Sequence, residues 1–191
     1  MDISHCFEQG SVVCDLASSE KYQALRELIC KAAVFSTVDN LDHFAAAVLS
    51  RERIQSTGLG RGVALAHGKA KGVKRTVIAL GISKSGINFN SVDTQPVQLL
   101  FIIAVAPNNQ TEYLAVLSTL VRLMRNSRFR TSVLEAPEAK RAESIMHEAF
   151  YQCLSASCSQ TSGSQTSGLS ASDSSASDSS ASRLHGAQTM A

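Results

Sequence analysis

The chain has 191 residues, a formal net charge of +2 and a hydrophobic content of 44%. These values suit one soluble domain with a buried core and exclude two large domains, while the small net charge by itself indicates no class of partner. Tryptophan is absent and aromatic residues make up only 5%, so the core must consist mainly of Leu, Ile, Val and Ala.

Two helices are predicted in the first third of the chain. A short apolar stretch at residues 12–16 precedes Ser18-Ser19, a pair suited to capping a helix. The next apolar residues recur at helical spacing over residues 22–32. A second set does so over residues 41–49, directly after Asp39-Asn40, which we expect to cap that helix.

Three strands and two further helices are predicted in the rest of the domain. Residues 63–67, 76–82 and 97–105 are apolar at most positions, which is typical of strands covered on both faces. Helical spacing returns over residues 114–124 and 142–150, and Pro137 is expected to open the last helix at its first turn.

The order of these elements predicts the fold class. Helices come before, between and after the strands, which favours an α/β fold, a three-layer α/β/α domain with a central mixed β-sheet. No helix separates residues 76–82 from residues 97–105, so we expect these two strands to pair as a hairpin across residues 83–96.

Residues 155–191 differ in composition from the rest of the chain. They contain no aromatic or β-branched aliphatic residue, and five-residue units repeat in tandem at 159–168 and 170–179. Such a segment cannot bury enough apolar surface to offset its ordering entropy. We predict one domain over residues 1–154 and a disordered Ser-rich low-complexity tail over 155–191. A phosphorylation or docking segment is the alternative for this tail.

The sequence contains no targeting or membrane signal that we can identify. The first residues are not basic and no apolar stretch follows them, and the most apolar run, residues 97–106, is half the length needed to cross a bilayer. We therefore expect a cytoplasmic protein without stable membrane insertion. Its cysteines are then expected to stay reduced.

The cysteines do not form a recognisable metal motif. No two of them are spaced as CxxC, so the sequence does not support a zinc site. His5-Cys6 is a possible ligand pair, but no further ligand follows at a metal-binding spacing. We therefore predict no metal and no cofactor. The five cysteines are Cys6, Cys14, Cys30, Cys153 and Cys158.

Three motifs that would indicate other enzyme classes are excluded. Gly58, Gly60 and Gly62 give GxGxG, whereas a dinucleotide fingerprint is GxGxxG. The span from Gly62 to Gly68 is one residue too long for a P-loop, and Lys69 is not followed by Ser or Thr. Residues 81–85 lack the second glycine of a GxSxG nucleophile elbow.

His67 is the remaining candidate for chemistry. It precedes Gly68, which is expected to let the backbone turn and bring amides close to a ligand. A neutral imidazole nitrogen can attack phosphorus, and nearby positive charge stabilises the transferred group. From the residues alone, an anion site at His67 and a merely structural or exposed histidine both remain open. The neighbouring basic residues are Arg61, Lys69, Lys71, Lys74 and Arg75.

The stretch from Arg51 to Gly68 contains Arg-Glu, then Ser56-Thr57-Gly58, then Gly-x-Ala-x-Ala-His ending at His67. This stretch resembles the signature of the type-2 enzyme IIA domain of the bacterial phosphotransferase system. That family includes fructose-specific, mannitol-specific and nitrogen-regulatory proteins, and the likeness is greatest to the nitrogen-regulatory branch. It continues through residues 77–81, 86–89, 93–97 and 106–107, includes residues 12–33, and so spans roughly the first 150 residues.

The resemblance implies a phosphoryl-relay function on a three-layer α/β/α fold. His67 is expected to accept a phosphoryl group from a phosphocarrier protein of the HPr type, with phosphoenolpyruvate as the ultimate donor through enzyme I. Arg51 matches the family arginine beside the active histidine, and its planar guanidinium suits phosphoryl oxygens. Ser56 and Thr57 either contact those oxygens or only form hydrogen bonds within their turn.

Two residues depart from the family pattern. Ala66 stands where the family usually has Pro, which removes a restraint on φ. Tyr113 stands where the family commonly has a second histidine, and a tyrosine hydroxyl can donate a hydrogen bond but cannot become cationic near neutral pH. We therefore expect slower or weaker phosphorylation than in a relative with the histidine.

The leading hypothesis is a regulatory phosphoryl acceptor whose state at His67 is signalled to protein partners, which the sequence does not identify. The alternatives are a non-catalytic interaction module of the same fold, and a sugar-transport enzyme IIA component that passes the group to a IIB domain. No nucleic-acid partner is expected, because a solvated helical face explains the basic cluster of Arg122, Arg125, Arg128 and Arg130.

Overall fold

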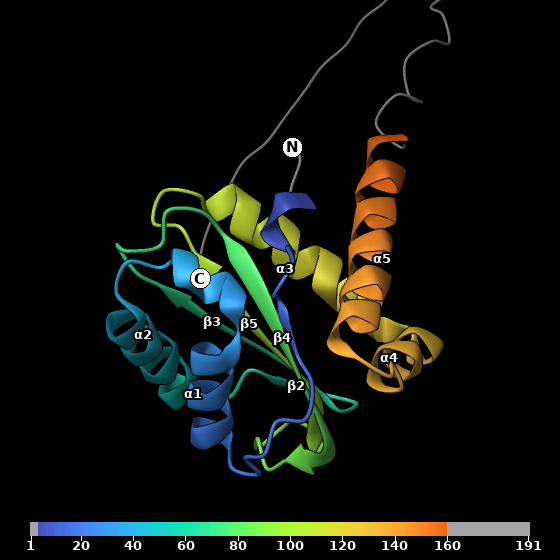
Figure 1. Ribbon diagram of the computed structural model, residues 1–191, viewed down its shortest axis with the longest axis horizontal. Coiled ribbons are helices and arrows are strands. Elements are labelled where there is room, and N and C mark those ends of the chain that lie inside the picture. Colours follow the sequence, from blue (N-terminus) through green and yellow to red (C-terminus); the bar gives the residue numbers. More distant parts are fainter. Residues whose placement is uncertain (1–3, 160–191) are drawn as a thin grey trace, which may run out of the picture.

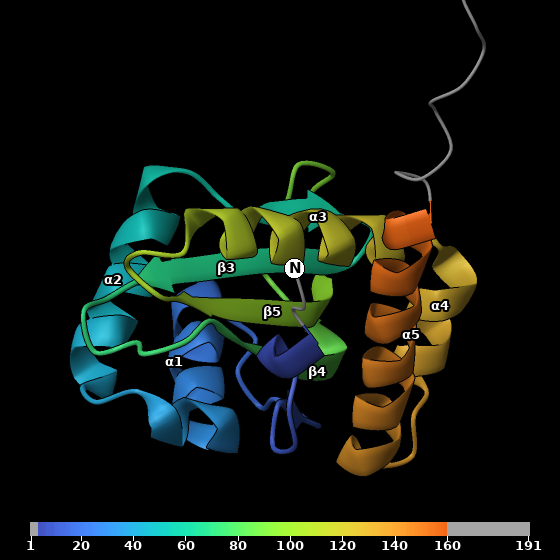
Figure 2. The same ribbon diagram turned by 90° about the horizontal axis from the view of Figure 1, so that it is seen from above.

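The computed structural model describes residues 4–159, in which five strands form one mixed sheet between two layers of helices (Figures 1 and 2). The strand order is β1-β4-β5-β3-β2. The sheet confirms the predicted α/β architecture and its mixed character. The strands are β1 (Val12–Val13), β2 (Gly58–Gly60), β3 (Val63–Lys69), β4 (Val77–Ile87) and β5 (Val97–Val105).

The pairing of the strands follows from what connects them. β4 and β5 pair antiparallel, as the missing helix between them predicts, but β4 continues to Ile87 and leaves a shorter loop than expected. β1 is parallel to β4 and β3 is parallel to β5, whereas β2 and β3 form an antiparallel pair. Central strands buried on both faces explain the nearly continuous apolar runs of β4 and β5.

Each face of the sheet packs against its own set of helices. One core lies under the helices that precede β2, and the other lies under η1 and the helices that follow β5. The first set consists of α1 (Lys21–Lys31), η2 (Ala33–Thr37) and α2 (Leu41–Ile54). The second set consists of η1 (Ser4–Cys6), α3 (Gln110–Arg125), α4 (Ser127–Leu134) and α5 (Ala139–Ser159).

The helix ends agree only partly with the sequence signals. Asn40 caps α2 as predicted, because its side chain accepts a hydrogen bond from the backbone N–H of His43 at 2.8 Å. The prediction that Ser18-Ser19 caps α1 is wrong. The N-cap is Glu20, which makes no side-chain cap bond, and the N–H of Ser18 instead donates to the carboxylate of Glu27.

The last helices also differ from the sequence prediction. α4 was not predicted, because its apolar residues are too few to produce a clear period. α5 begins at Ala139, two residues after Pro137, and ends at Ser159, beyond the predicted domain boundary at 154. The rest of the predicted tail lies outside the described residues, so the division at 154 stays a prediction. No described helix is long and apolar enough to span a membrane.

Candidate functional site

His67 lies near the end of β3, on the face of the sheet that α3 covers. Side chains alternate along a strand, so Ala64 and Ala66 enter the core under α1 and α2, while Val63 and Leu65 enter the other core. His67 follows Leu65 by two positions and therefore points toward α3. The ring of Tyr113, in the first turns of α3, lies with its centroid 5.3 Å from that of His67, and the ring planes are inclined by 43°.

The surroundings of His67 favour the neutral imidazole. Burial lowers the pKa of His67 from its ordinary value of 6.5, and the positive charge of Arg51 lowers it further, against the opposing effects of the Leu65 backbone and the Glu52 carboxylate. Nδ1 is buried and has no hydrogen-bond partner among the described residues. The ring is therefore mostly uncharged near pH 7 and retains a nitrogen lone pair for nucleophilic attack.

Arg51 approaches His67 from the opposite layer of the fold. It lies in the last turn of α2, yet its charge lowers the pKa of both His67 and Tyr113, which belong to β3 and α3. Since α2 and α3 cover opposite faces, their side chains can meet only around an edge of the sheet. β2 pairs with β3 only near Val63 and Ala64, so the outer edge beside His67 is left for Arg51.

A buried carboxylate holds the turn that follows Arg51. The side chain of Glu52 is fully buried, and its Oε1 lies 3.2 Å from Nζ of Lys21, whose side chain is 9% exposed. Its Oε2 accepts a hydrogen bond from the hydroxyl of Thr57 at 2.5 Å, and the carboxylate also accepts from the N–H of Thr57. Sequence reasoning assigned no role to Glu52, although it belongs to the Arg-Glu pair.

The hydroxyls of Ser56 and Thr57 both donate hydrogen bonds to protein acceptors. The hydroxyl of Ser56 donates to the carbonyl oxygen of Phe89 at 3.0 Å, and the hydroxyl of Thr57 donates to Glu52. The carbonyl of Thr57 accepts from the N–H of Leu65, which joins the turn to β3 two residues before His67. Local hydrogen bonding, one of the two predicted roles, therefore describes Thr57, whereas Ser56 joins the turn to the loop that follows β4.

Gly68 has a different role from the predicted one. It is a regular residue of β3, paired with Ala104, and does not turn the backbone around a ligand. A Cβ at this position would lie 2.6 Å from Cγ2 of Val48 and 3.0 Å from its backbone nitrogen. The glycine therefore allows α2 to pack closely on β3, and Arg51 follows Val48 by one helical turn.

Three of the basic residues near His67 in sequence have other partners or lie away from it. Lys74 pairs with Asp39 at 2.9 Å, and Arg75 pairs with Glu8. Arg61 lies in the turn between β2 and β3, at the far end of β3 from His67. Among residues 5–153, Arg51 is the cation that lowers the pKa of the His67 imidazole.

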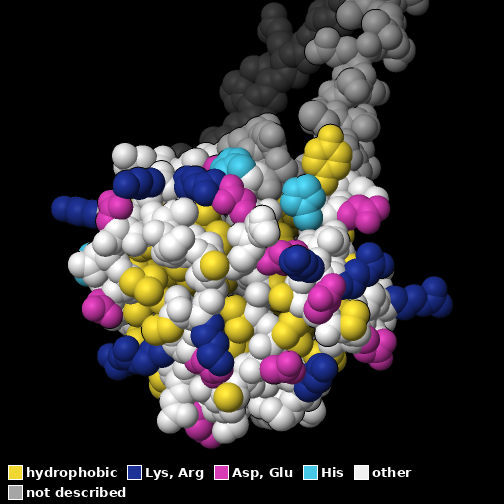
Figure 3. Space-filling model, viewed as in Figure 1, with side chains coloured by type: hydrophobic (Ala, Val, Ile, Leu, Met, Phe, Trp, Pro, Cys, Tyr) yellow, Lys and Arg dark blue, Asp and Glu magenta, His cyan; other side chains and the backbone are white. Residues whose placement is uncertain are grey.

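The four arginines predicted on one helical face belong to two helices, α3 and α4. Arg122 donates to the carbonyl of Cys153 at 2.7 Å, and Arg130 donates to the carbonyl of Met124 at the end of α3 at 2.6 Å. Figure 3 shows Lys and Arg side chains scattered over the visible face and not gathered in one patch. This distribution offers no continuous basic surface on that face.

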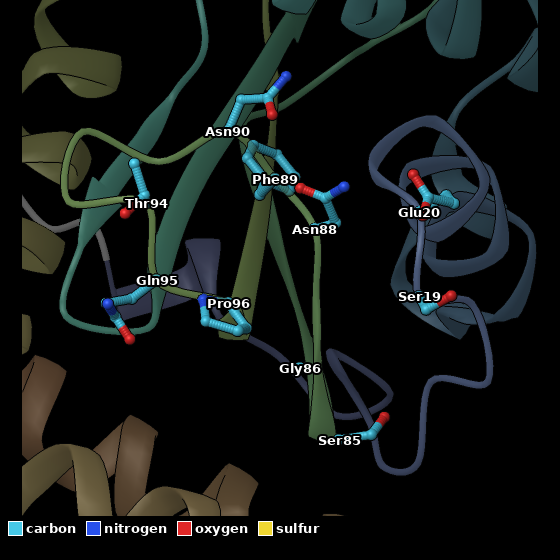
Figure 4. A pocket seen from close by; sticks show the side chains of 10 residues that line it. All are labelled: Ser19, Glu20, Ser85, Gly86, Asn88, Phe89, Asn90, Thr94, Gln95 and Pro96. Atoms are coloured by element: carbon cyan, nitrogen blue, oxygen red, sulfur yellow. The ribbon is translucent and has the colours of Figure 1, made fainter.

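A separate cavity of about 380 Å³ lies at the other end of the sheet (Figure 4). Ser19 and Glu20 line it from the start of α1, and the rest of the lining comes from the end of β4 and the loop before β5, including Asn88 and Gln95. None of the predicted site residues lines this cavity, so it is distinct from the site at His67.

Comparison with known proteins identifies the fold that carries this site. Residues 5–149 match the family described as the phosphoenolpyruvate-dependent sugar phosphotransferase system, EIIA 2. The chain belongs to this type-2 enzyme IIA family. The family match covers the sheet, both helical layers and every residue of the candidate site, and it supports a role in phosphoryl relay.

Similar enzyme IIA proteins carry two kinds of name. The chain is 31% identical over 136 residues to the fructose-specific EIIABC component of Bacillus subtilis, covering 71% of this chain but about a fifth (21%) of that protein. It is 31% identical over 128 residues to the fructose-specific EIIA component of Haloferax volcanii, and the match covers 67% of this chain and 83% of that protein. It is 28% identical over 146 residues to the nitrogen regulatory protein of Bradyrhizobium diazoefficiens, covering 76% and 95%.

Solved enzyme IIA structures share the architecture. The nitrogen regulatory protein IIA-Ntr of Neisseria meningitidis superposes with a TM-score of 0.69 at 28% identity, covering 75% of this chain and 98% of that one. The mannitol enzyme IIA of Escherichia coli, solved in complex with phosphorylated mannitol enzyme IIB, superposes with a TM-score of 0.61 at 16% identity, covering 74% and 96%. At that identity the second likeness concerns the fold alone.

Proposed function

We propose that His67 accepts a phosphoryl group from a phosphocarrier protein of the HPr type, and that its state of phosphorylation is signalled to protein partners. The observation that carries the proposal is the placement of His67, a partly exposed and predominantly neutral imidazole near the end of a buried strand, with Arg51 beside it. Family membership and the similar nitrogen regulatory proteins support the same role.

Nε2 is the ring nitrogen that we assign to the reaction. Nδ1 is buried, so an incoming phosphorus atom cannot reach it. In the transfer, the lone pair of Nε2 forms a bond to phosphorus while the bond from phosphorus to the phosphocarrier's histidine nitrogen breaks. That nitrogen keeps the electron pair, so the step needs alignment and charge stabilisation but no general base.

Arg51 is proposed to stabilise the transferred group. Its Nη1 donates to the carbonyl of Gln55 at 3.1 Å, which holds the guanidinium at the end of α2. Among the described residues Arg51 forms no ion pair, so its charge is available to an anion at His67. Removing one preorganised donor of this kind typically lowers a rate by about 100- to 1,000-fold, and Arg51→Gln is expected to fall in that range.

The proposal also explains how a small covalent change can act as a signal. A phosphoryl group adds a charge of about −1.5 to −2 near neutral pH. His67 is only partly buried, so this charge would appear on a surface that α2 and the start of α3 share. A partner that contacts this surface would distinguish the two states of His67. The proposal requires the chain and the phosphocarrier to share a compartment. We predict that this compartment is the cytoplasm.

The test is phosphorylation of the full chain in a reconstituted system. The protein is incubated with phosphoenolpyruvate, enzyme I and a phosphocarrier, and its intact mass is measured at neutral pH. We expect one acid-labile phosphoryl adduct. The adduct should be absent from His67→Ala and present in His43→Ala, a matched control because His43 is an exposed histidine of α2.

Absence of the adduct, while a known enzyme IIA is labelled in the same tube, would contradict the proposal. The non-catalytic interaction module would then be the better hypothesis, and it predicts partner binding that His67→Ala does not change. The fructose-specific names among the relatives favour one further candidate, a sugar-transport component. That hypothesis predicts rapid transfer of the phosphoryl group from His67 to a purified fructose IIB domain.

A further inference from the structure

Three potential metal ligands converge outside the site at His67. His5 and Cys6 belong to η1, and Glu112 belongs to the first turn of α3. Nε2 of His5 lies 3.0 Å from Oε1 of Glu112 and 3.6 Å from Sγ of Cys6. All the ligand atoms of this cluster lie within 4.8 Å of one another. An imidazole, a thiol and a carboxylate therefore lie close enough together to contact one ion.

The separations suit a tetrahedral ion with mixed ligands. Zinc bonds of about 2.3 Å to sulfur and about 2.1 Å to nitrogen and oxygen place sulfur and nitrogen about 3.6 Å apart, and nitrogen and oxygen about 3.4 Å apart. The observed sulfur–nitrogen distance already has this value, and the nitrogen–oxygen distance of 3.0 Å needs only a small side-chain adjustment. Zinc accepts nitrogen, sulfur and oxygen ligands together.

We propose that His5, Cys6 and Glu112 bind one Zn²⁺ ion, with a fourth position open to water. The burial of the ligands supports this assignment. Cys6 is fully buried, Glu112 is only 5% exposed, and Oε2 of Glu112 is a buried oxygen with no hydrogen-bond partner in the part of the chain that the structure describes. A buried carboxylate is unfavourable unless its charge is compensated, and a divalent cation compensates both Glu112 and a Cys6 thiolate.

The exposure of one ligand suits metal uptake. The side chain of His5 is 41% exposed, which gives an ion access to an otherwise buried cluster. Binding would replace the proton that the imidazole of His5 shares with Glu112.

The sequence did not predict this site because its ligands lack a metal-binding spacing. η1 supplies two adjacent ligands, and the third comes from a helix that packs against the same face of the sheet much later in the chain. A bound ion would join η1 to the first turn of α3. Tyr113, which contacts His67, is the next residue after Glu112, so the ion would fix the turn beside the proposed phosphorylation site.

The proposal is tested on the full chain after treatment with a chelator. Zinc stoichiometry is measured by elemental analysis after dialysis against ZnCl₂, and affinity is measured by competition with a chromophoric chelator. We expect one ion per chain. Co²⁺ in place of zinc should give a thiolate charge-transfer band and the visible bands of a tetrahedral ion. Glu112→Gln should weaken zinc binding by more than about tenfold, and Cys6→Ser should abolish the charge-transfer band.

Matched controls separate this cluster from other thiols and imidazoles. Cys30→Ser and His43→Gln change exposed residues outside the cluster and should bind zinc as the wild type does. His67→Ala should also bind zinc normally, so failure of the phosphorylation proposal leaves this one standing. Substoichiometric zinc, or equal affinity in the wild type and in Glu112→Gln, would overturn the proposal. The cobalt spectrum of the wild type tests thiolate ligation even if a variant fails to fold.

Discussion

The ring of Tyr113 packs against the ring of His67 with 5.3 Å between the two ring centroids, and this contact joins α3 to the end of β3. Burial raises the pKa of the Tyr113 hydroxyl, although Arg51 acts in the opposite direction, so this neighbour stays uncharged at neutral pH. Its hydroxyl makes no hydrogen bond to another described residue. The neighbour of His67 on α3 therefore provides an aromatic surface and a neutral donor, and Arg51 provides the positive charge.

A first prediction concerns this neutral neighbour. Tyr113→His introduces a second imidazole that carries a proton at mildly acidic pH and can make a charge-assisted hydrogen bond to phosphoryl oxygens. Such a bond is worth about 1–3 kcal/mol, which corresponds to a rate about 5- to 150-fold higher. The gain in phosphorylation rate should be larger near pH 6 than near pH 8. Tyr113→Phe is the matched control, and equal rates in the wild type and Tyr113→His would contradict the prediction.

A second prediction concerns the pKa of His67. Arg51→Gln removes a positive charge that lowers this pKa, so the pKa should rise. Burial, which is the largest cause of the lowered pKa, is unchanged in this variant and continues to oppose protonation. The measurement is a titration of the imidazole signals by NMR. Arg53→Gln removes a charge from the same turn of α2 and should leave the titration of His67 unchanged, and an equal shift in both variants would point to a general change in the helix.

The third prediction follows from the same pKa by linkage. Because the folded pKa of His67 is below 6.5, the unfolded chain binds more protons than the folded chain between these two values, and stability falls as the pH drops through that window. His67→Gln should therefore lose less unfolding free energy than the wild type between about pH 7 and pH 5. Urea unfolding at each pH measures this, with His43→Gln as the control. Equal losses of unfolding free energy in the wild type, His67→Gln and His43→Gln would contradict the prediction that His67 causes this pH dependence.

The buried pair of Glu52 and Lys21 leads to a fourth prediction. Removing one partner of a buried ion pair leaves the other charge uncompensated and typically costs about 3–5 kcal/mol, so Glu52→Ala should lower the free energy of unfolding by an amount in that range. Urea denaturation measures the change. Lys21→Met combined with Glu52→Gln should be less destabilised than Glu52→Ala alone. Asp39→Asn, which removes an exposed ion pair with Lys74, should have only a small effect.

A fifth prediction tests the packing of α2 on β3. Gly68→Ala places a methyl group 2.6 Å from Cγ2 of Val48, so α2 must shift, and overpacking of this kind typically costs about 1–3 kcal/mol. Because α2 carries Arg51, the phosphorylation rate should fall as well. Val48→Ala in the Gly68→Ala background should recover part of both losses. If the rate falls in Gly68→Ala without any loss of stability, displacement of the helix is not the cause.

The sequence by itself was sufficient for the fold class and for the placement of His67 near the end of a buried strand. Segments with apolar residues at helical spacing lie before and after apolar runs typical of buried strands, and this order predicted helices around a mixed sheet. Both patterns reflect how a helix or a strand buries its apolar side chains. The absence of a helix between β4 and β5 predicted their antiparallel pairing. The spacing from Arg51 to His67 indicated the enzyme IIA family, which the comparisons confirm.

Only the tertiary structure decided which residues meet. It places Arg51 and Tyr113 on either side of His67 from helices on opposite faces, and it pairs Lys74 with Asp39 and Arg75 with Glu8. It assigns Gly68 to helix packing and brings Glu112 to His5 and Cys6. These relationships depend on strand order, helix packing distances and an open sheet edge. Such features arise from contacts between residues far apart in the chain, whereas a local sequence pattern reports only on how each segment buries its own side chains.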